Sequence, residues 1–319
     1  MTGFLKTCNL LHITTICGMI YNITSYMEDF PMSNFVVYTD SGCDISPELL
    51  TEWGVSYSSL TFRFEGEGIE YSNTDLPVKD FYERMRSGDI AKTSAINIGN
   101  FIDAFEALLQ NGKDILYLGF SSALSTTYNS AVIAAQQLSV QYPERKIITV
   151  DSLSASAGQG LLVYLASEKQ KSGATLDETA TYIKDIQLRI CHWFTVDDLE
   201  YLKRGGRVSP TVAFVGNVLG IKPVLHVNNE GKLINISKIR GRKNSLAALA
   251  EKYTELAADP ASGTVFISHS DCAEDAKVLA NLLHERHNVD VQLITSIGTV
   301  IGAHTGPGTV ALFFIGKKR

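Results

Sequence analysis

Short runs of apolar, β-branched or aromatic residues alternate along this chain with longer stretches in which apolar residues recur at helical spacing. Phe35 to Tyr38 is a clear run of the first kind, and the stretch 99–110 carries apolar residues at positions i, i+4, i+7 and i+8. Such alternation is typical of strand–helix units built around a mainly parallel sheet. The pattern therefore predicts an α/β protein.

In the first half of the chain the apolar runs predict three strands, at 35–39, 115–119 and 146–150. The intervening periodic stretches predict helices over 46–53, 99–110, 124–141, 153–171 and 175–188. A new strand-like run begins at Cys191. We therefore place a domain boundary near residue 190 and expect a first α/β domain over 32–190, with a mainly parallel sheet flanked by helices.

The second half mixes both kinds of stretch again. It predicts strands at 191–196, 232–238, 264–269, 290–295 and 309–315, and helices at 209–219, 242–257 and 271–286. The turn residues 228–231, Asn-Asn-Glu-Gly, lie between apolar runs and indicate a hairpin with antiparallel strands. We therefore expect a second α/β domain over 191–319, with a mixed sheet and helices.

Residues 1–31 stand apart from this pattern. The moderately apolar stretch from Phe4 to Tyr21 has Lys6 as its single charged residue and no small-residue cleavage site, which argues against an export signal. No run reaches the roughly 20 apolar residues that a membrane-spanning helix needs. Because Met32 directly precedes the first strand pattern, we interpret 1–31 as an N-terminal extension and expect no stable membrane insertion.

The composition narrows the classes of function. The net charge of −6 provides no overall positive field, so nucleic acid is not an expected partner. The five cysteines are odd in number and form no CxxC pair, which favours a reducing, cytoplasmic location and indicates no zinc site. No other metal site and no cofactor is predicted.

Polar clusters follow the predicted strands of the first half: Asp40-Ser41-Gly42-Cys43-Asp44, then Ser121-Ser122-Ala123-Leu124-Ser125, then Asp151-Ser152. In open α/β sheets, ligands bind where strands end and helices begin. The same residue types also cap helices, which is the alternative for any one of them. Together with Thr93 and Ser94, the serines of these clusters provide hydroxyl donors suited to a carboxylate or a phosphate. The expected ligand therefore has a small anionic headgroup.

Two enzyme classes compete with a binding function. A nucleotide site is disfavoured because neither GxxxxGK[ST] nor GxGxxG after a strand is present. A small-ester hydrolase could use Ser125 and His304 with Asp40 or Asp151, although the chain has no GxSxG elbow. The hydrolase stays open as the alternative.

A glycine-rich stretch, 298–308, contains His304 between Gly302 and Gly306, and its glycines permit positive φ and close approach to a ligand. His304 could bind a carboxylate, act as a base, or make a structural hydrogen bond. Two basic runs, 203–207 and 238–243, combine arginine with glycine in an otherwise acidic chain. They are either a solvated face or a surface for a phosphate or an acidic partner.

Taken in order, these motifs resemble the DegV family from about residue 35 to the end of the chain. They are Asp40-Ser41-x-x-Asp44, Thr93-Ser94, Ser121-Ser122-x-Leu124-Ser125-x-Thr127-Tyr128, Arg204-Gly205-Gly206-Arg207, Lys222-Pro223 and Gly302-x-His304-x-Gly306-Pro307-Gly308. The resemblance implies two α/β domains with one long-chain fatty acid between them. It also implies a partner, a fatty acid kinase, to which the protein presents the carboxyl group for acyl phosphate formation, feeding phospholipid synthesis without turnover of its own.

The resemblance also assigns roles to residues. Thr93, Ser94, Ser125 and His304 are expected to bind the fatty acid carboxyl group. Support of the surrounding loops is expected from Asp40, Ser41, Ser122, Thr126, Gly302 and Gly306. The residues expected to face the partner or a phosphate are Arg207, Arg240 and Arg242.

One departure from the family pattern bears on the geometry. Thr126 stands where the family usually has glycine. A β-branched side chain disfavours positive φ, so it would crowd the headgroup if that position needed such a conformation.

Overall fold

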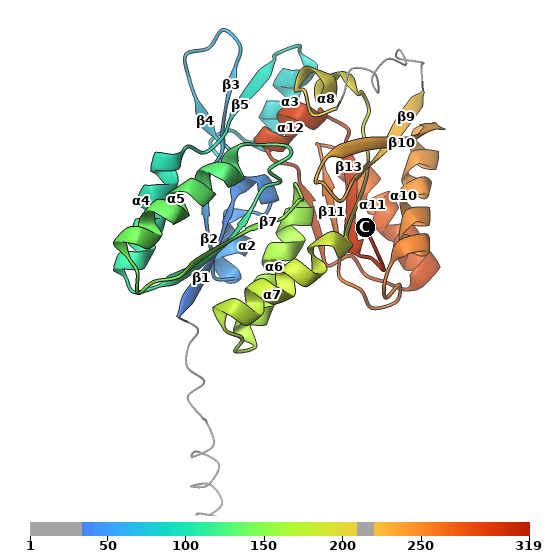
Figure 1. Cartoon of the computed structure of the whole chain (residues 1–319). Coiled ribbons are helices and arrows are strands. Elements are labelled where there is room, and N and C mark those ends of the chain that lie inside the picture. Colours follow the sequence, from blue (N-terminus) through green and yellow to red (C-terminus); the bar gives the residue numbers. More distant parts are fainter. Residues whose placement is uncertain (1–33, 209–219) are drawn as a thin grey trace, which may run out of the picture.

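The computed structural model describes residues 34–208 and 220–319. Its first half contains a four-stranded, wholly parallel sheet in the order β2-β1-β6-β7 (Figure 1). The strands are β1 (Phe35–Asp40), β2 (Val55–Ser58), β6 (Asp114–Gly119) and β7 (Ile147–Asp151). The mainly parallel sheet predicted for this half and its three predicted strands are confirmed, and β2 is an addition.

Helices cover both faces of this sheet because alternate side chains of its central strands point to opposite sides. Tyr38 and Tyr117 point to one side of the sheet, where they pack with a pair of helices. Val37 and Leu118 point to the other side, where they pack with a second group of helices. The first pair is α4 (Ile98–Gln110) and α5 (Thr127–Gln141). Lying on the other side are α2 (Pro47–Glu52), α6 (Ala157–Lys171) and α7 (Leu176–Ile186), which leads into the 3-10 turn η2 (Gln187–Arg189).

The second half contains a six-stranded mixed sheet in the order β10-β9-β8-β13-β11-β12. Its strands are β8 (Ile190–Thr195), β9 (Ile221–Val227), β10 (Leu233–Arg240), β11 (Val265–His269), β12 (Leu293–Ser296) and β13 (Val310–Ile315). The helices α10 (Arg242–Leu256) and α11 (Ala273–His287) cover one face. The predicted hairpin at 228–231 joins antiparallel β9 and β10 and is confirmed.

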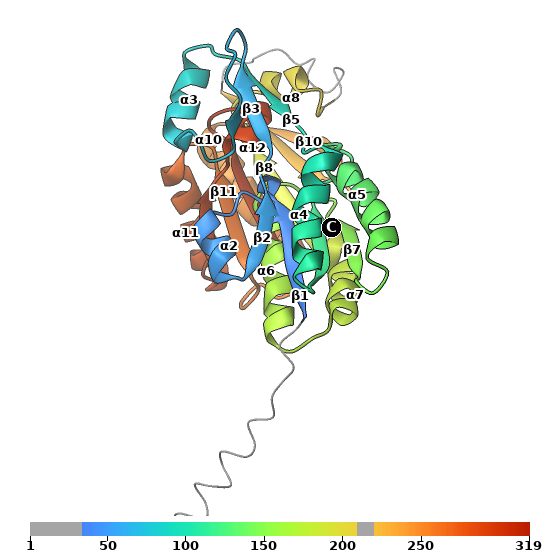
Figure 2. The same cartoon turned by 90° about the vertical axis from the view of Figure 1, so that its left-hand side faces the viewer.

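Several short elements were not predicted from the sequence. A three-stranded antiparallel sheet in the order β4-β3-β5 lies beside the helices α3, α8 and α12 (Figure 2). These elements are β3 (Thr61–Phe64), β4 (Tyr71–Ser72), β5 (Ala91–Ser94), α3 (Val78–Arg86), α8 (Glu200–Arg204), α12 (Thr299–Thr305) and the 3-10 turn η1 (Ser41–Cys43). Apart from α3, each has at most seven residues, too few for a clear period. The predicted helix 209–219 and the extension 1–31 lie outside the described residues.

Helix α6 is the layer that joins the two large sheets, since it packs against strands of both. Close approach requires glycine: a Cβ atom at Gly158 would lie 2.5 Å from the His192 ring and 2.7 Å from Phe313. The four-stranded sheet ends at Asp151 and the six-stranded sheet begins at Ile190, on either side of α6 and α7. The shared core therefore keeps the two halves in a fixed relation, while the boundary near residue 190 stays a prediction.

Replacing Gly158 by alanine tests this contact. We expect Gly158→Ala to lower the free energy of unfolding by about 1–3 kcal/mol, because the added methyl group displaces buried rings. Chemical denaturation measures the change. Gly68→Ala is the matched control, since a Cβ atom there meets nothing within 4 Å. Equal stability of the two variants would contradict the packing argument.

Candidate ligand-binding site

A cavity of about 450 Å³ lies between the two halves of the molecule. This volume falls within the roughly 300–1,000 Å³ of pockets that hold small ligands. Its apolar wall comes from both halves, and includes Leu60, Phe120, Leu124, Phe194, Val300 and Phe313. Its polar lining includes the exposed residues Ser94, Ser122 and Thr126, so the cavity opens to solvent at this polar part.

Two of the predicted site residues meet across the cavity. The Thr93 hydroxyl oxygen on β5 lies 2.9 Å from Nε2 of His304 on α12 and forms a hydrogen bond with it. Ser94 follows Thr93 on the same strand and therefore points its side chain the other way. Its hydroxyl group acts with that of Thr61 to lower the pKa of the Glu70 carboxyl group. Ser94 thus lines the cavity without joining the Thr93–His304 pair through its hydroxyl group.

The His304 ring is neutral at pH 7. Burial lowers its pKa to about 4, and the positive charge of Arg207 acts in the same direction. Its Nδ1 atom is buried and has no hydrogen-bond partner among the described residues. The backbone of Gly205 packs directly against this nitrogen and leaves no room for a side chain. His304 is therefore a neutral hydrogen-bonding group rather than a cation.

Ser125 lies at the start of α5. Its hydroxyl group is 2.9 Å from that of Thr127 and accepts a hydrogen bond from the Thr127 amide at 3.2 Å. Thr126 has φ −77°, an ordinary helical value, so the crowding considered for a positive φ does not arise. Ser125 and Thr126, which directly precede this 15-residue helix, line the cavity, and a helix N-terminus favours an anion.

Arg207 supplies positive charge to the cavity wall. Its Nε atom donates to the Leu124 carbonyl oxygen at 3.1 Å, and its guanidinium group also donates to the Gly205 carbonyl oxygen. Burial lowers the pKa of Arg207, but an arginine stays charged in a protein. The guanidinium group is therefore held in place beside His304 and facing the cavity.

Two of the residues predicted to support the loops, Asp40 and Ser41, form buried hydrogen bonds. Both carboxylate oxygens of Asp40 are occupied: they accept from the Gly42 amide at 3.0 Å, the Phe120 amide at 2.9 Å and the Tyr117 hydroxyl group at 2.7 Å. Burial raises the pKa of Asp40 despite these donors. The Ser41 hydroxyl group accepts from the Leu60 amide at 2.9 Å.

Ser122, Gly302 and Gly306 belong to the same predicted group, and each makes a contact through its backbone. The Ser122 amide donates to the Asp151 carboxylate at 3.3 Å. Gly302 lies against the Tyr82 hydroxyl group with no space for a side chain. Gly306 ends α12 with φ +74°, the left-handed conformation that favours glycine.

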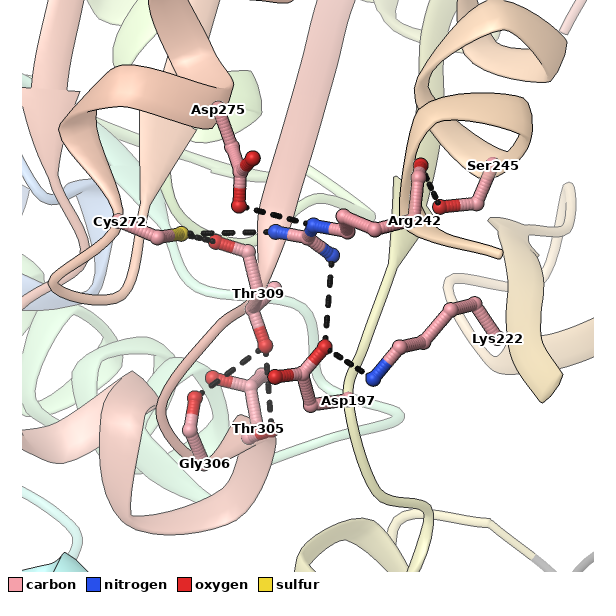
Figure 3. A network of polar contacts seen from close by, with 9 residues as sticks. All are labelled: Asp197, Lys222, Arg242, Ser245, Cys272, Asp275, Thr305, Gly306 and Thr309. Carbon is pink, nitrogen blue, oxygen red and sulfur yellow. Dashed lines mark hydrogen bonds and ion pairs between the residues drawn. The ribbon is translucent and has the colours of Figure 1, made fainter. Parts of the chain in front are cut away.

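The two remaining arginines differ. Arg240 is exposed at the end of β10. Arg242 is mostly buried and forms ion pairs with Asp275 at 2.9 Å and with Asp197 at 3.6 Å (Figure 3). The Arg242 side chain is thus paired within the protein, and Arg242 is not included among the residues that we propose to contact a partner.

Much of the apolar wall could not be recognised from the sequence. Leu60, Phe194, Val300 and Phe313 belong to strands, loops or a helix that also serve the core, and their pattern is that of ordinary buried residues. Thr127 stands in a family motif without a predicted role, yet its buried hydroxyl group links Ser125 to the Ile96 amide. For the wall residues on strands, the one available signal is the alternation of side chains, which shows which of them share a face.

Comparison with known proteins decides the family. The DegV family model, described as an uncharacterised protein family, matches residues 34–317. The chain belongs to the DegV family. A DegV domain-containing protein of Clostridium perfringens is 44% identical over 289 residues, which cover 90% of this chain and 99% of the relative.

Solved structures of DegV proteins share the fold. A DegV lipid-binding protein from Thermotoga maritima superposes with a TM-score of 0.79 at 30% identity, covering 90% of this chain and 99% of the other. A stearic-acid-binding protein from Eubacterium ventriosum superposes with a TM-score of 0.80 at 26% identity, covering 89% and 98%. The structural neighbours of this DegV protein are thus lipid-binding and fatty-acid-binding proteins.

The geometry of a hydrolase is missing from the described residues. His304 bonds to Thr93 rather than to Ser125, and no carboxylate group there contacts its Nδ1 atom. Over 34–208 and 220–319 there is also no group of three or more potential metal-ligating side chains. Within the same part of the chain, no helix is long and apolar enough to span a bilayer.

The low pKa of His304 predicts a pH dependence of stability. Between an unfolded pKa of about 6.5 and the folded value of about 4, the unfolded chain binds the proton and the folded protein does not. Stability is therefore lost as the pH falls through this window, by at most about 3 kcal/mol from this group. His304→Gln should flatten the dependence between pH 7 and 4 in denaturant titrations; an unchanged slope would contradict the burial of a neutral ring.

Proposed function

We propose that this DegV protein binds one long-chain fatty acid, with its tail in the cavity and its carboxyl group at Thr93, Ser125 and His304. The observation that carries the proposal is the asymmetry of the cavity. It is an apolar chamber between two sheets whose polar lining includes hydroxyl groups, a neutral histidine and a half-buried arginine. The fatty-acid-binding and lipid-binding neighbours support the same ligand class.

The apolar wall provides most of the affinity. Burying roughly 14 methylene groups at about 0.8 kcal/mol each contributes ~11 kcal/mol of gross attraction. Loss of motion on association offsets a good part of this. The remainder allows micromolar or tighter binding, so the polar groups chiefly fix the orientation of the acid and prevent an unpaired buried charge.

The protonation states favour an ionised carboxyl group. Nε2–H of a neutral His304 can donate to the Thr93 oxygen, which leaves the Thr93 hydroxyl proton free for the ligand. The Ser125 hydroxyl group adds a donor, and the N-terminus of α5 adds the positive end of a helix dipole. Arg207 supplies the positive charge that a carboxylate, or later an acyl phosphate, requires.

We further propose that the protein has no turnover of its own and presents the acid, in the cytoplasm, to a fatty acid kinase, whose acyl phosphate product serves phospholipid synthesis. The polar part of the cavity is open to solvent, which would let a kinase reach the carboxyl oxygen. The exposed Arg240 offers a contact for an acidic partner surface. The absence of a serine–histidine hydrogen bond in the described site also favours presentation over ester hydrolysis.

The ligand class is tested first. Native mass spectrometry of the purified full chain, followed by extraction and lipid identification, is expected to find one fatty acid per protein or uptake of added oleate to that ratio. A protein that arrives empty and takes up no added fatty acid would overturn the proposal.

The headgroup assignment is tested by removing one donor. Ser125→Ala is expected to weaken fatty acid affinity by about 10- to 100-fold, because a hydrogen bond to a charged group contributes about 1.5–3 kcal/mol. Isothermal titration with a soluble fatty acid measures the change. Ser139→Ala is the control, since its hydroxyl group bonds within α5 to Ala135. Equal affinities for both variants would remove Ser125 from the site.

The partner assignment needs a variant that leaves the cavity intact. Arg240→Ala is expected to keep fatty acid affinity and to lower the rate of the kinase reaction at limiting protein by about tenfold, as expected for the loss of one charged contact at an interface. Lys184→Ala, on the outer side of α7, is the control. Unchanged kinase rates with Arg240→Ala would count against this contact.

A further inference from the structure

We infer that Asn73 and Asp44 are positioning residues, which set His304 against Thr93 by holding the N-terminus of helix α12. The inference rests on the proposed function for its affinity readout, but the contacts that carry it are independent of any ligand. Neither residue touches His304, so each acts through the helix.

Helix α12 cannot hold its own position. It has seven residues, Thr299–Thr305, and an isolated helix of that length is unstable in water. Its N-cap residue is Gly298, which has no side chain to accept from the first-turn amides. Acceptors for these amides must therefore come from elsewhere in the protein.

Asn73 supplies one set of acceptors. Its Oδ1 atom accepts from the Val300 amide and from the Thr299 hydroxyl group, both at 3.0 Å. Its Nδ2 atom donates to the Ser41 carbonyl oxygen at 3.3 Å, and its own amide donates to the Ser59 hydroxyl group at 3.1 Å. Asn73 thus caps the helix while being fixed to two loops of the first half.

Asp44 supplies the other acceptor. Its buried Oδ1 atom accepts from the Gly298 amide at 2.9 Å, and its carbonyl oxygen accepts from the Thr295 hydroxyl group at 3.0 Å. A Cβ atom at Gly298 would lie 2.7 Å from Asn73 and 2.9 Å from Asp44. The two side chains therefore replace a local cap by one that comes from the other half of the chain.

The remaining contacts of α12 fix its other surfaces. Beneath it, the Tyr82 hydroxyl group donates to the Ile297 carbonyl oxygen at 2.9 Å. At its C-terminus the Thr309 hydroxyl group bonds to the carbonyl oxygens of Thr305 and Gly306, next to the Asp197 ion pairs (Figure 3). The C-terminal end is thus held within the second half. The N-terminal cap, Tyr82 and the Thr93–His304 hydrogen bond connect the helix to the first half.

This cap and the ligand donor Thr93 share one small sheet. Asn73 directly follows β4, Thr93 lies on β5, and both strands pair with β3 between them. A shift of that sheet would therefore carry the cap and Thr93 together, and α12 would follow. The arrangement maintains the 2.9 Å contact between Thr93 and His304, which belong to different halves of the chain.

The experiment compares Asn73→Ala with Asn73→Asp, which retains an acceptor oxygen at the helix N-terminus. Imidazole NMR of the ligand-free full chain reports the titration of His304, assigned with His304→Gln, and oleate titration reports affinity. In Asn73→Ala we expect the pKa of His304 to move toward its ordinary value and affinity to fall about tenfold, in line with loss of a helix cap. Asn73→Asp should restore most of both, and Asn111→Ala, at the far end of α4, should change neither.

Unchanged His304 titration and unchanged affinity in Asn73→Ala would overturn the inference. So would an equal loss in Asn73→Asp while its thermal stability stays at the wild-type level. If Asn73→Ala does not fold, Asp44→Ala with the conservative Asp44→Asn gives the same comparison. Wild-type protein that binds no oleate would refute the proposed function, while the NMR titration would still decide the positioning role.

Discussion

A hydrogen bond between the Thr93 hydroxyl group and the His304 ring joins residues 211 positions apart and fixes how the halves of this DegV protein meet at the cavity. The sheet that carries Thr93 and the helix that carries His304 belong to different halves. Other polar groups of the site, Ser125 and Arg207 among them, line the same cavity. The proposed binding of a carboxyl group therefore depends on the relative position of the two halves.

The rest of the structure maintains the relative position of the two halves by close packing and by hydrogen bonds between segments that are distant in the sequence. Helix α6 lies between the large sheets, and Gly158 allows His192 and Phe313 to approach its backbone. Helix α12 takes its N-terminal cap from Asn73 and Asp44. Because packed interiors resist small displacements, such contacts specify position strongly. The site is therefore held mainly from outside its own lining.

The electrostatics follow from burial. The chain has a net charge of −6, yet the cavity contains a half-buried guanidinium group and a histidine kept neutral by desolvation. A neutral ring can donate one proton and accept another, which suits a network with Thr93 better than a second cation would. Local charge, rather than the charge of the whole chain, determines what this site can bind.

The sequence by itself determined the α/β class, the parallel first sheet, the mixed second sheet and the motifs around Thr93, Ser125 and His304, because period and strand-end polarity are local properties. Tertiary structure decided the rest. The short elements β3, β5 and α12 have too few residues for a readable period, and Ser94 points away from its neighbour Thr93 because strand side chains alternate. Arg242 pairs with Asp197 and Asp275 only after distant segments meet. Contacts of that kind depend on the packing of the whole chain, which no local pattern encodes.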